Sequence, residues 1–162
     1  MQSFPTPTLI DAKPRHLIGM HLPMSHAEHR VQELWRGFMP RRGEVQGAIS
    51  QDLFSVNVYP PDFFAAYDAA RIFTKWAALE VNLECEVPTH MERLAVPGGL
   101  YAVFHYIGPS SDPAIFAYIY GTWLPQNGYR PDARPHFEVL GPRYSNTSPV
   151  SEEDIWVPVV AL

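Results

Sequence analysis

Residues 135–140 read PHFEVL and residues 154–159 read DIWVPV, and these two stretches decide how the chain is interpreted. Both are short and rich in β-branched and aromatic residues, which is typical of buried strands. Because side chains alternate between the two faces of a strand, Phe137 and Val139 share one face while Glu138 points to the other. The pattern therefore predicts a carboxylate within a buried strand.

Glu138 is the first candidate functional residue. A carboxylate that points toward the interior must find a partner, shift its pKa, or line a cavity that receives a cation. The alternative is that Glu138 is a partly exposed strand residue paired with Arg143. A role in lining a pocket is the interpretation that we follow here.

The chain before residue 135 predicts a strand and a helix. Residues 99–107 read GLYAVFHYI, a strand with several aromatic residues. Asp112 followed by Pro113 is a typical helix N-terminus. PQNG at 125–128 ends that helix. Its apolar stripe has the i, i+3, i+4, i+7 spacing of an amphipathic helix: Phe116, Ile119, Tyr120 and Trp123.

The first part of the chain predicts the same order of elements. Residues 15–22 read as a strand. Ser25, with Glu28 three residues later, forms a capping box that predicts the start of a helix. Strands are predicted at 52–59 and 74–87. The helix again carries an i, i+3, i+4, i+7 stripe: Val31, Leu34, Trp35 and Phe38.

Two halves, each strand–helix–strand–strand, therefore repeat at about 85 residues. This predicts an α+β fold made by a pseudo-symmetric duplication, with an antiparallel sheet, two main helices and a central ligand groove on the pseudo-two-fold axis. The expected domain covers 14–160, with halves at about 14–90 and 93–160. Residues 1–13 are expected to form a loose leader.

Composition excludes several classes of protein. Hydrophobic residues make up 46% of the 162 and charged residues 18%, so a disordered chain is excluded. A net charge of −5 argues against nucleic-acid binding. The single cysteine, Cys85, excludes an intramolecular disulfide. No signal peptide and no membrane-spanning stretch are present in the sequence, so we expect a cytoplasmic protein without a membrane partner.

The layout resembles the GyrI-like small-molecule-binding domain, a duplicated SHS2-like unit that serves as the effector-binding domain of bacterial multidrug-sensing AraC/MerR-type transcription activators. The resemblance covers about residues 14–160. It rests on an ordered set of motifs: GLYAVFH at 99–105, WLPQNGY at 123–129, PHFE at 135–138 and IWVPV at 155–159. Because nearly all of the chain is used by the two halves, it resembles the freestanding members of the family.

The resemblance implies a ligand and a site. In this family the groove between the halves holds hydrophobic, often cationic, aromatic compounds, and a glutamate at the position of Glu138 faces the ligand. Chemistry is consistent with this role, since a buried carboxylate ringed by aromatics attracts a lipophilic cation.

Trp76 is expected to line the groove because it lies on the more polar face of its predicted strand. For the aromatics of the two helices, packing in the core is the alternative to lining the groove. His105 and His136 are candidates for the groove as well, although a histidine satisfied within the core is the default for either residue. The predicted ligand-binding residues are Glu138, Trp76, Trp123, Tyr120, Phe104, His136, Trp35 and Phe38.

The spacing of His21, His26 and His29 is similar to that of metal-binding histidines. They would have to converge across a strand–helix turn, and no cysteine lies nearby, so neither a metal nor a cofactor is expected.

Three functions stay open on the sequence. The first is a protein that binds hydrophobic, cationic aromatic compounds and is not an enzyme. The second is a GyrI-like hydrolase that acts on electrophilic cyclopropane-containing compounds, with Glu138 as general base. The third is a protein-binding regulator of a topoisomerase, whose acidic surface meets a basic protein partner; a homodimer is a further alternative.

Overall fold

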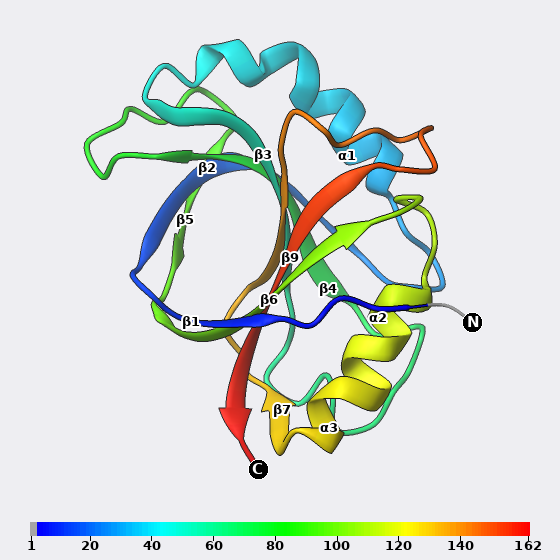
Figure 1. Ribbon diagram of the computed structural model, residues 1–162. Coiled ribbons are helices and arrows are strands. Elements are labelled where there is room, and N and C mark those ends of the chain that lie inside the picture. Colours follow the sequence, from blue (N-terminus) through cyan, green and yellow to red (C-terminus); the bar gives the residue numbers. More distant parts are fainter. Residues whose placement is uncertain (1–2) are drawn as a thin grey trace.

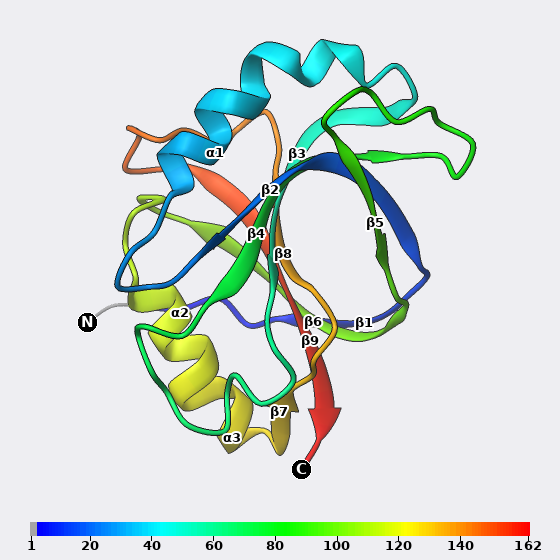
Figure 2. The same ribbon diagram turned by 180° about the vertical axis from the view of Figure 1, so that it is seen from behind.

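The computed structural model describes residues 3–162. In this part of the chain, nine strands form one open, antiparallel sheet, and two helical segments pack against it (Figures 1 and 2). The strand order is β1-β6-β9-β8-β3-β4-β2-β5, and β7 pairs with β9. The predicted α+β fold is confirmed. The strands are β1 (Thr8–Ala12), β2 (Arg15–Met24), β3 (Ala48–Val58), β4 (Phe73–Val81), β5 (Glu92–Val96), β6 (Gly99–Ile107), β7 (Tyr129–Pro131), β8 (His136–Leu140) and β9 (Glu152–Ala161).

The strand order is symmetric about the boundary between β8 and β3, so that β1 corresponds to β5, β2 to β6, β4 to β9 and β3 to β8. Shifting β1 by 84 residues gives 92–96, the bounds of β5, and shifting Arg15, where β2 begins, gives Gly99, where β6 begins. The predicted duplication is confirmed. The halves also exchange their first strands, since β1 pairs with β6 and β5 pairs with β2.

Two helical segments lie apart from each other, at the top and at the bottom of Figures 1 and 2. The first is α1 (Val31–Phe38), which continues into a 3₁₀ turn at Met39–Glu44. The second is α2 (Ala114–Tyr118), which continues through a π-helical turn at Ile119–Trp123 into α3 (Leu124–Gln126). Within residues 3–162, none of the helices has the length and apolar character needed to cross a membrane.

One of the two predicted helix starts agrees with the structure, and the other does not. Asp112 Oδ1 accepts a hydrogen bond from the Ala114 N–H at 2.9 Å, which agrees with the predicted helix start. Ser25 Oγ accepts one from the Glu28 N–H at 3.0 Å, yet α1 begins only at Val31. The backbone N–H of Ala27 donates to the Ala69 carbonyl, so the predicted first turn is bound to the segment between β3 and β4 and does not become helical.

Both helices pack on the same face of the sheet, which we call the helix face. One core cluster lies under α1 and includes Leu34 and Leu79; a second lies under α2 and includes Ile119 and Val157. A third cluster, which includes Phe137, lies on the opposite face. The sheet is thus covered at two places on the helix face, with its central strands between them.

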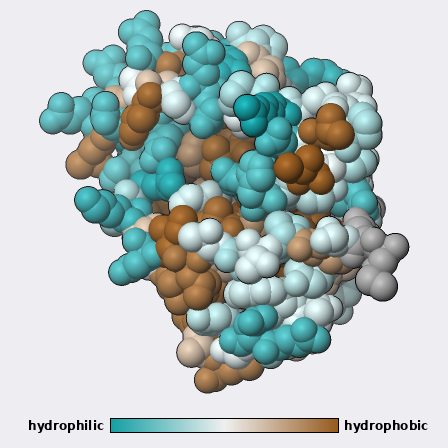
Figure 3. All heavy atoms as spheres, in the orientation of Figure 1, coloured by the Kyte–Doolittle hydropathy of each residue, from teal (hydrophilic) through white to brown (hydrophobic). Residues whose placement is uncertain are grey.

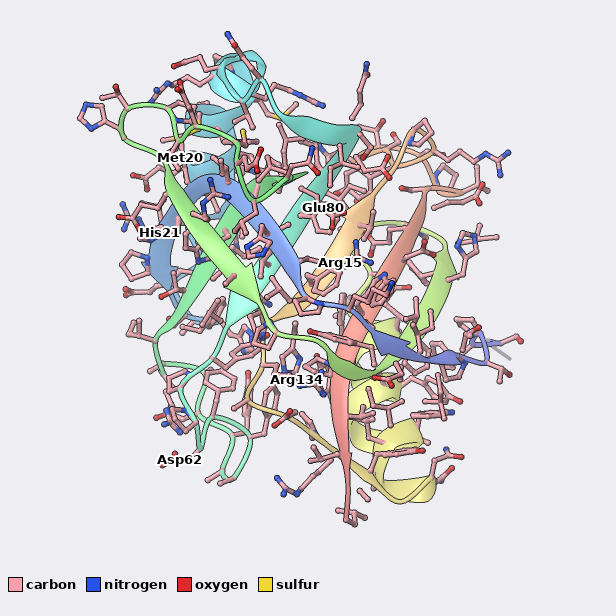
Figure 4. The ribbon with its side chains drawn as sticks, turned by 90° about the vertical axis from the view of Figure 1, so that its left-hand side faces the viewer. Arg15, Met20, His21, Asp62, Glu80 and Arg134 are labelled. Carbon is pink, nitrogen blue, oxygen red and sulfur yellow. The ribbon has the colours of Figure 1, made fainter. Side chains whose placement is uncertain are left out.

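The opposite face curls around a core of its own. Arg15 forms a salt bridge to Glu80 at 2.9 Å, and its guanidinium lies 4.7 Å from the ring centroid of Trp156 and 5.5 Å from that of Phe137. Figure 4 shows Arg15 and Glu80 near the middle of the curled strands. Side-chain atoms fill the ring that the ribbon outlines in Figure 1, as the space-filling view in Figure 3 shows. We therefore assign Arg15 a structural role.

β1 and β4 are among the strands that differ from the prediction. Residues 8–12, expected in a loose leader, form β1 on the edge of the sheet beside β6. The strand predicted at 74–87 ends at Val81 as β4, because the chain turns at once and the Cys85 N–H bonds to the Asn82 carbonyl.

Candidate ligand-binding site

Glu138 lies at the centre of the helix face, on the pseudo-two-fold axis. Ser55 of β3 pairs directly with Glu138 of β8, and these are the two strands that meet at the axis. Ser55 pairs on its other side with Ala77, and Glu138 with Ile155. This row of four residues runs across the middle of the sheet, and Ala77 and Ile155 belong to the core clusters under α1 and α2.

Lys75 and Glu153 occupy equivalent positions on either side of the axis. The equivalent residues His21 and His105 pair with Trp76 and Asp154, respectively, so Lys75 of β4 corresponds to Glu153 of β9. Each lies two residues before a member of the central row and therefore faces the same way. The centre of the helix face thus carries four ionisable side chains: Lys75, His136, Glu138 and Glu153. We call Ser55, Asn57, Lys75, His136, Glu138 and Glu153 the axial cluster.

Glu153 is the most deeply buried carboxyl of the axial cluster, with 5% of its surface exposed. Burial, the charge of Glu138 and a hydrogen bond between the two carboxyls raise the pKa of Glu153 to about 9. Burial lowers the pKa of Lys75, an effect that the charges of Glu138 and Glu153 oppose. At neutral pH, Glu153 is therefore a protonated acid beside the Glu138 carboxylate.

Tyrosines surround these charges. Burial raises the pKa of Tyr59, Tyr120 and Tyr144 above its ordinary value, and the Glu138 charge raises each further. Asn57 donates to the Tyr59 hydroxyl at 2.7 Å, while its own carbonyl oxygen is buried without a partner. The site therefore offers neutral aromatic rings with hydroxyl groups, and one buried acceptor that is not satisfied within residues 3–162.

His136 links β8 to the helix above it. Its Nε2 lies 3.1 Å from the Asp132 carbonyl, and its Nδ1 lies 2.8 Å from the Tyr120 hydroxyl. A carbonyl only accepts, so Nε2 carries the hydrogen and Nδ1 accepts from Tyr120. Burial lowers the pKa of His136 to about 4, so the ring is neutral at physiological pH. It therefore adds no positive charge to the site.

An aromatic belt continues from His136 onto the segment between β3 and β4. Phe64 stacks on Tyr120 at 5.3 Å and on His136 at 5.2 Å, although 40% of Phe64 is exposed. A cavity of about 260 Å³ adjoins this belt; it is lined by residues 59–62, Phe64, Ala65 and residues 130–133. An opening thus lies beside the rings that flank the axial cluster.

The structure brings some of the predicted site residues together and leaves others apart. Glu138, His136 and Tyr120 meet between the two helices. Trp76 lies on the opposite face, 6% exposed, in the third core cluster with its ring 4.4 Å from His21. The polar face of β4, which suggested a groove, is the face that curls around Arg15 and Glu80.

The remaining predicted aromatics pack in the cores under the helices. Phe38 and Phe104 are fully buried. Trp35 meets Phe38 edge to face, and Trp123 meets Phe104 in the same way. Their helical spacing therefore reflects packing, which was the alternative interpretation.

Sequence reasoning missed Lys75, Glu153, Tyr59 and Tyr144. For the first two, a signal was present: each is a charged residue at the head of an apolar alternating series, Lys75 before Ala77 and Glu153 before Ile155. That is the same signal that identified Glu138. For the two tyrosines no local signal exists, because they lie outside the regular strands, at the ends of connecting segments.

Arg143, the alternative partner of Glu138, and the histidines with metal-like spacing lie away from the site. Arg143 approaches Glu152 at 3.5 Å, so it is not the partner of Glu138. His21 contacts Glu92 at 2.7 Å, whereas His26 packs on Phe73. No group of three or more side chains suited to a metal ion occurs among residues 3–162.

Comparison with known families assigns the domain. A family model described as Cass2, an integron-associated effector binding protein, matches residues 8–159. The chain belongs to this family. This confirms the predicted GyrI-like assignment and shows that the chain is an effector-binding domain by family.

One curated relative is the transcriptional regulator BrlR of Pseudomonas aeruginosa, which is 28% identical over 146 residues, or 88% of this chain. The chain spans about half the length of BrlR, at 51%.

Solved structures share the fold at low sequence identity. The integron cassette protein VCH_CASS2 of Vibrio cholerae has a TM-score of 0.66 at 13% identity, with 97% of each chain covered. SAV2435 bound to tetraphenylphosphonium has a TM-score of 0.65 at 14% identity, covering 95% of this chain and 93% of that one. A protein described as a hydrolase encoded by lin2189 from Listeria innocua has a TM-score of 0.57 at 12% identity, covering 97% and 93%.

Proposed function

We propose that the domain binds a hydrophobic, cationic aromatic compound between α1 and α2, over Glu138. The observation that carries the proposal is the position of this carboxylate at the centre of the helix face, with Tyr59 and Tyr120 beside it. A carboxylate in such a setting attracts a cation strongly, because little water screens it. Tyrosine rings add cation–π attraction and a surface for the apolar part of the ligand.

Two further features support a ligand at this place. The Asn57 carbonyl oxygen is buried without a partner, and a bound molecule could satisfy it. The cavity beside Tyr59 and Phe64 reaches the same belt of rings. The family supports the proposal as well, since SAV2435, which shares the fold, was solved with tetraphenylphosphonium.

The test is calorimetric titration with tetraphenylphosphonium and with the neutral compound triphenylphosphine oxide. We expect the cation to bind, and Glu138→Gln to weaken its binding by about 1.5–3 kcal/mol, the range for hydrogen bonds to charged groups. That range corresponds to ~10–100-fold in Kd. The neutral compound should bind the wild type and the variant alike, because only the charge has been removed.

Glu84→Gln is the matched control. Glu84 is exposed in the turn after β4, so this variant changes the net charge equally but away from the site. Equal cation affinity in wild type and Glu138→Gln would show that Glu138 is a structural strand residue.

A hydrolase is the second candidate function, and the Glu138–Glu153 pair favours it. Two adjacent carboxyls, one ionised and one protonated, can serve as base and acid. Glu138 would take a proton from a water molecule while the oxygen of that water attacks a strained cyclopropane carbon. Glu153 would then protonate the ring carbon that is released when the carbon–carbon bond breaks. Mass spectrometry after incubation with an electrophilic cyclopropane compound tests this: a product heavier by one water supports the hydrolase, and unchanged compound supports the binding protein.

A further inference from the structure

Glu138 and Glu153 lie side by side on the helix face. Glu138 pairs with Ile155, and Glu153 lies two residues before Ile155 on the same face of β9, so the two carboxyls are diagonal neighbours. Glu153 is 5% exposed, and within residues 3–162 no Lys, Arg or His nitrogen lies within 4.0 Å of either carboxyl. Two carboxylates in this position cannot both ionise cheaply, so they share one proton.

Several elements contribute an ionisable group near Glu153. β4 contributes Lys75, β8 contributes Glu138, and the segment before β9 contributes Tyr144. Tyr106 of β6 pairs with Glu153 across the ladder, and Asp154 is its neighbour in sequence. Lys75 is the one cation among these groups, and it stands opposite Glu153 across the axis.

The net charge of Lys75, Glu138 and Glu153 determines whether a bound cation is compensated. With Glu153 protonated and Lys75 charged, the Glu138 carboxylate and the Lys75 ammonium balance each other; burial lowers the pKa of Lys75, and the charges of Glu138 and Glu153 oppose that effect. A monovalent cation that enters this site would leave one positive charge uncompensated in a poorly solvated place, which is costly. Loss of the proton from Glu153 restores the balance and gives the cation a second carboxylate.

We propose that the site exchanges ions: one monovalent cation enters and the shared proton of the Glu138–Glu153 pair leaves to solvent. This inference rests on the proposed function, because it concerns the same ligand at the same site. The exchange makes affinity depend on pH, since each proton released raises the association constant by up to about tenfold per pH unit. A neutral ligand of similar shape brings no charge and releases no proton.

The experiment is titration of the whole chain with tetraphenylphosphonium in phosphate and in Tris, whose ionisation enthalpies differ, from about pH 6 to about pH 8.5. We expect close to one proton released per cation near pH 7.5, and a Kd that tightens as the pH rises. Glu153→Gln should still bind, release no proton and lose the pH dependence. Release of a full proton by Glu153→Gln would overturn the inference, because the proton would then come from another group, such as Lys75.

Two further measurements keep the inference testable should Glu153→Gln fail to fold. An infrared difference spectrum of the wild type should lose the carbonyl band of a protonated carboxyl when the cation binds. In Lys75→Met the cation itself balances Glu138, so proton release should fall toward zero; full release in this variant would contradict the charge count. Cation binding that releases no proton and does not change with pH overturns the exchange and leaves the proposed function standing. If no cation binds at all, the proposed function itself fails.

Discussion

His136 is a buried neutral histidine, and its titration couples the site to the stability of the fold. Burial lowers its pKa from 6.5 to about 4. Between these two pH values, His136 binds a proton in the unfolded chain but stays neutral in the folded chain. The stabilisation is complete above pH 6.5 and is lost as the pH falls toward 4. The two pKa values differ by about 2.5, which corresponds to roughly 3 kcal/mol.

We therefore predict that His136→Gln flattens the dependence of stability on pH between about 6.5 and about 4. Glutamine can still accept from Tyr120 and donate to the Asp132 carbonyl, but it does not titrate in this range. Urea denaturation across this range measures the effect. His29→Gln, at an exposed position, should keep the slope of the wild type. If the slope is the same in all three proteins, His136 is not the group that titrates.

At the residue scale, the sequence identified the site only where a side chain contradicted its surroundings. Glu138 could be predicted because a carboxylate in an apolar strand is costly unless it has a use. Trp76 was placed wrongly, because the polar face of its strand turned out to be the inside of the curled sheet. Strand alternation tells which residues share a face, but which face the helices cover depends on how the whole sheet is built.

At the scale of elements, β2 and β4 approach each other closely at Gly19. A Cβ built at this position would lie 2.0 Å from the Ala77 carbonyl oxygen and 2.7 Å from the Ala78 Cα, both backbone atoms that cannot turn away. We predict that Gly19→Ala destabilises the fold by ~1–3 kcal/mol or more, the usual cost of overpacking. Gly43→Ala is the matched control, since a Cβ there meets nothing within 4 Å.

The two variants should differ in their melting temperatures. In thermal denaturation, Gly19→Ala should melt well below the wild type and Gly43→Ala close to it. A Gly19→Ala protein with the wild-type melting temperature would mean that β2 and β4 can separate without loss.

The elements with a strong periodic pattern were predicted, and those that depend on a distant partner were not. The apolar stripes gave both helices, and the strands at 52–59 and 99–107 correspond to β3 and β6. β1 and β5 were missed, because five-residue edge strands carry little periodic signal and each is held by a strand of the other half. Likewise, Ser25 and Glu28 predict a helix start, but the hydrogen bond from the Ala27 N–H to the Ala69 carbonyl holds this segment outside the helix.

At the scale of the whole molecule, the exchange of β1 and β5 ties the two halves together. β1 pairs with β6 at five positions, from Thr8 with Val103 to Ala12 with Gly99. We predict that deletion of residues 1–12 lowers stability by on the order of 3 kcal/mol, since each paired position contributes about 0.5–1.5 kcal/mol in hydrogen bonding. It should also promote association of the protein, because β6 becomes an open edge.

Urea denaturation and size-exclusion chromatography measure both effects. Leu9→Ser provides the control: Leu9 lies on β1 but is 47% exposed, so this change should preserve both stability and the monomer-to-oligomer ratio of the wild type. An unchanged denaturation midpoint after the deletion would show that the exchanged strand contributes nothing to the joining of the halves.

The pairing of Ser55 with Glu138 on the axis has a consequence for any guest molecule. Two identical chains related by a true two-fold would carry the same residue twice at this place, either two serines or two mutually repelling glutamates. The same holds for Lys75 and Glu153, a basic and an acidic residue at matching positions. Fusion of the repeats into one polypeptide lets each copy diverge on its own. The fold stays pseudo-symmetric while the side chains of the site become asymmetric. An asymmetric ligand therefore has one preferred orientation, whereas a symmetric dimer would offer two orientations of equal energy.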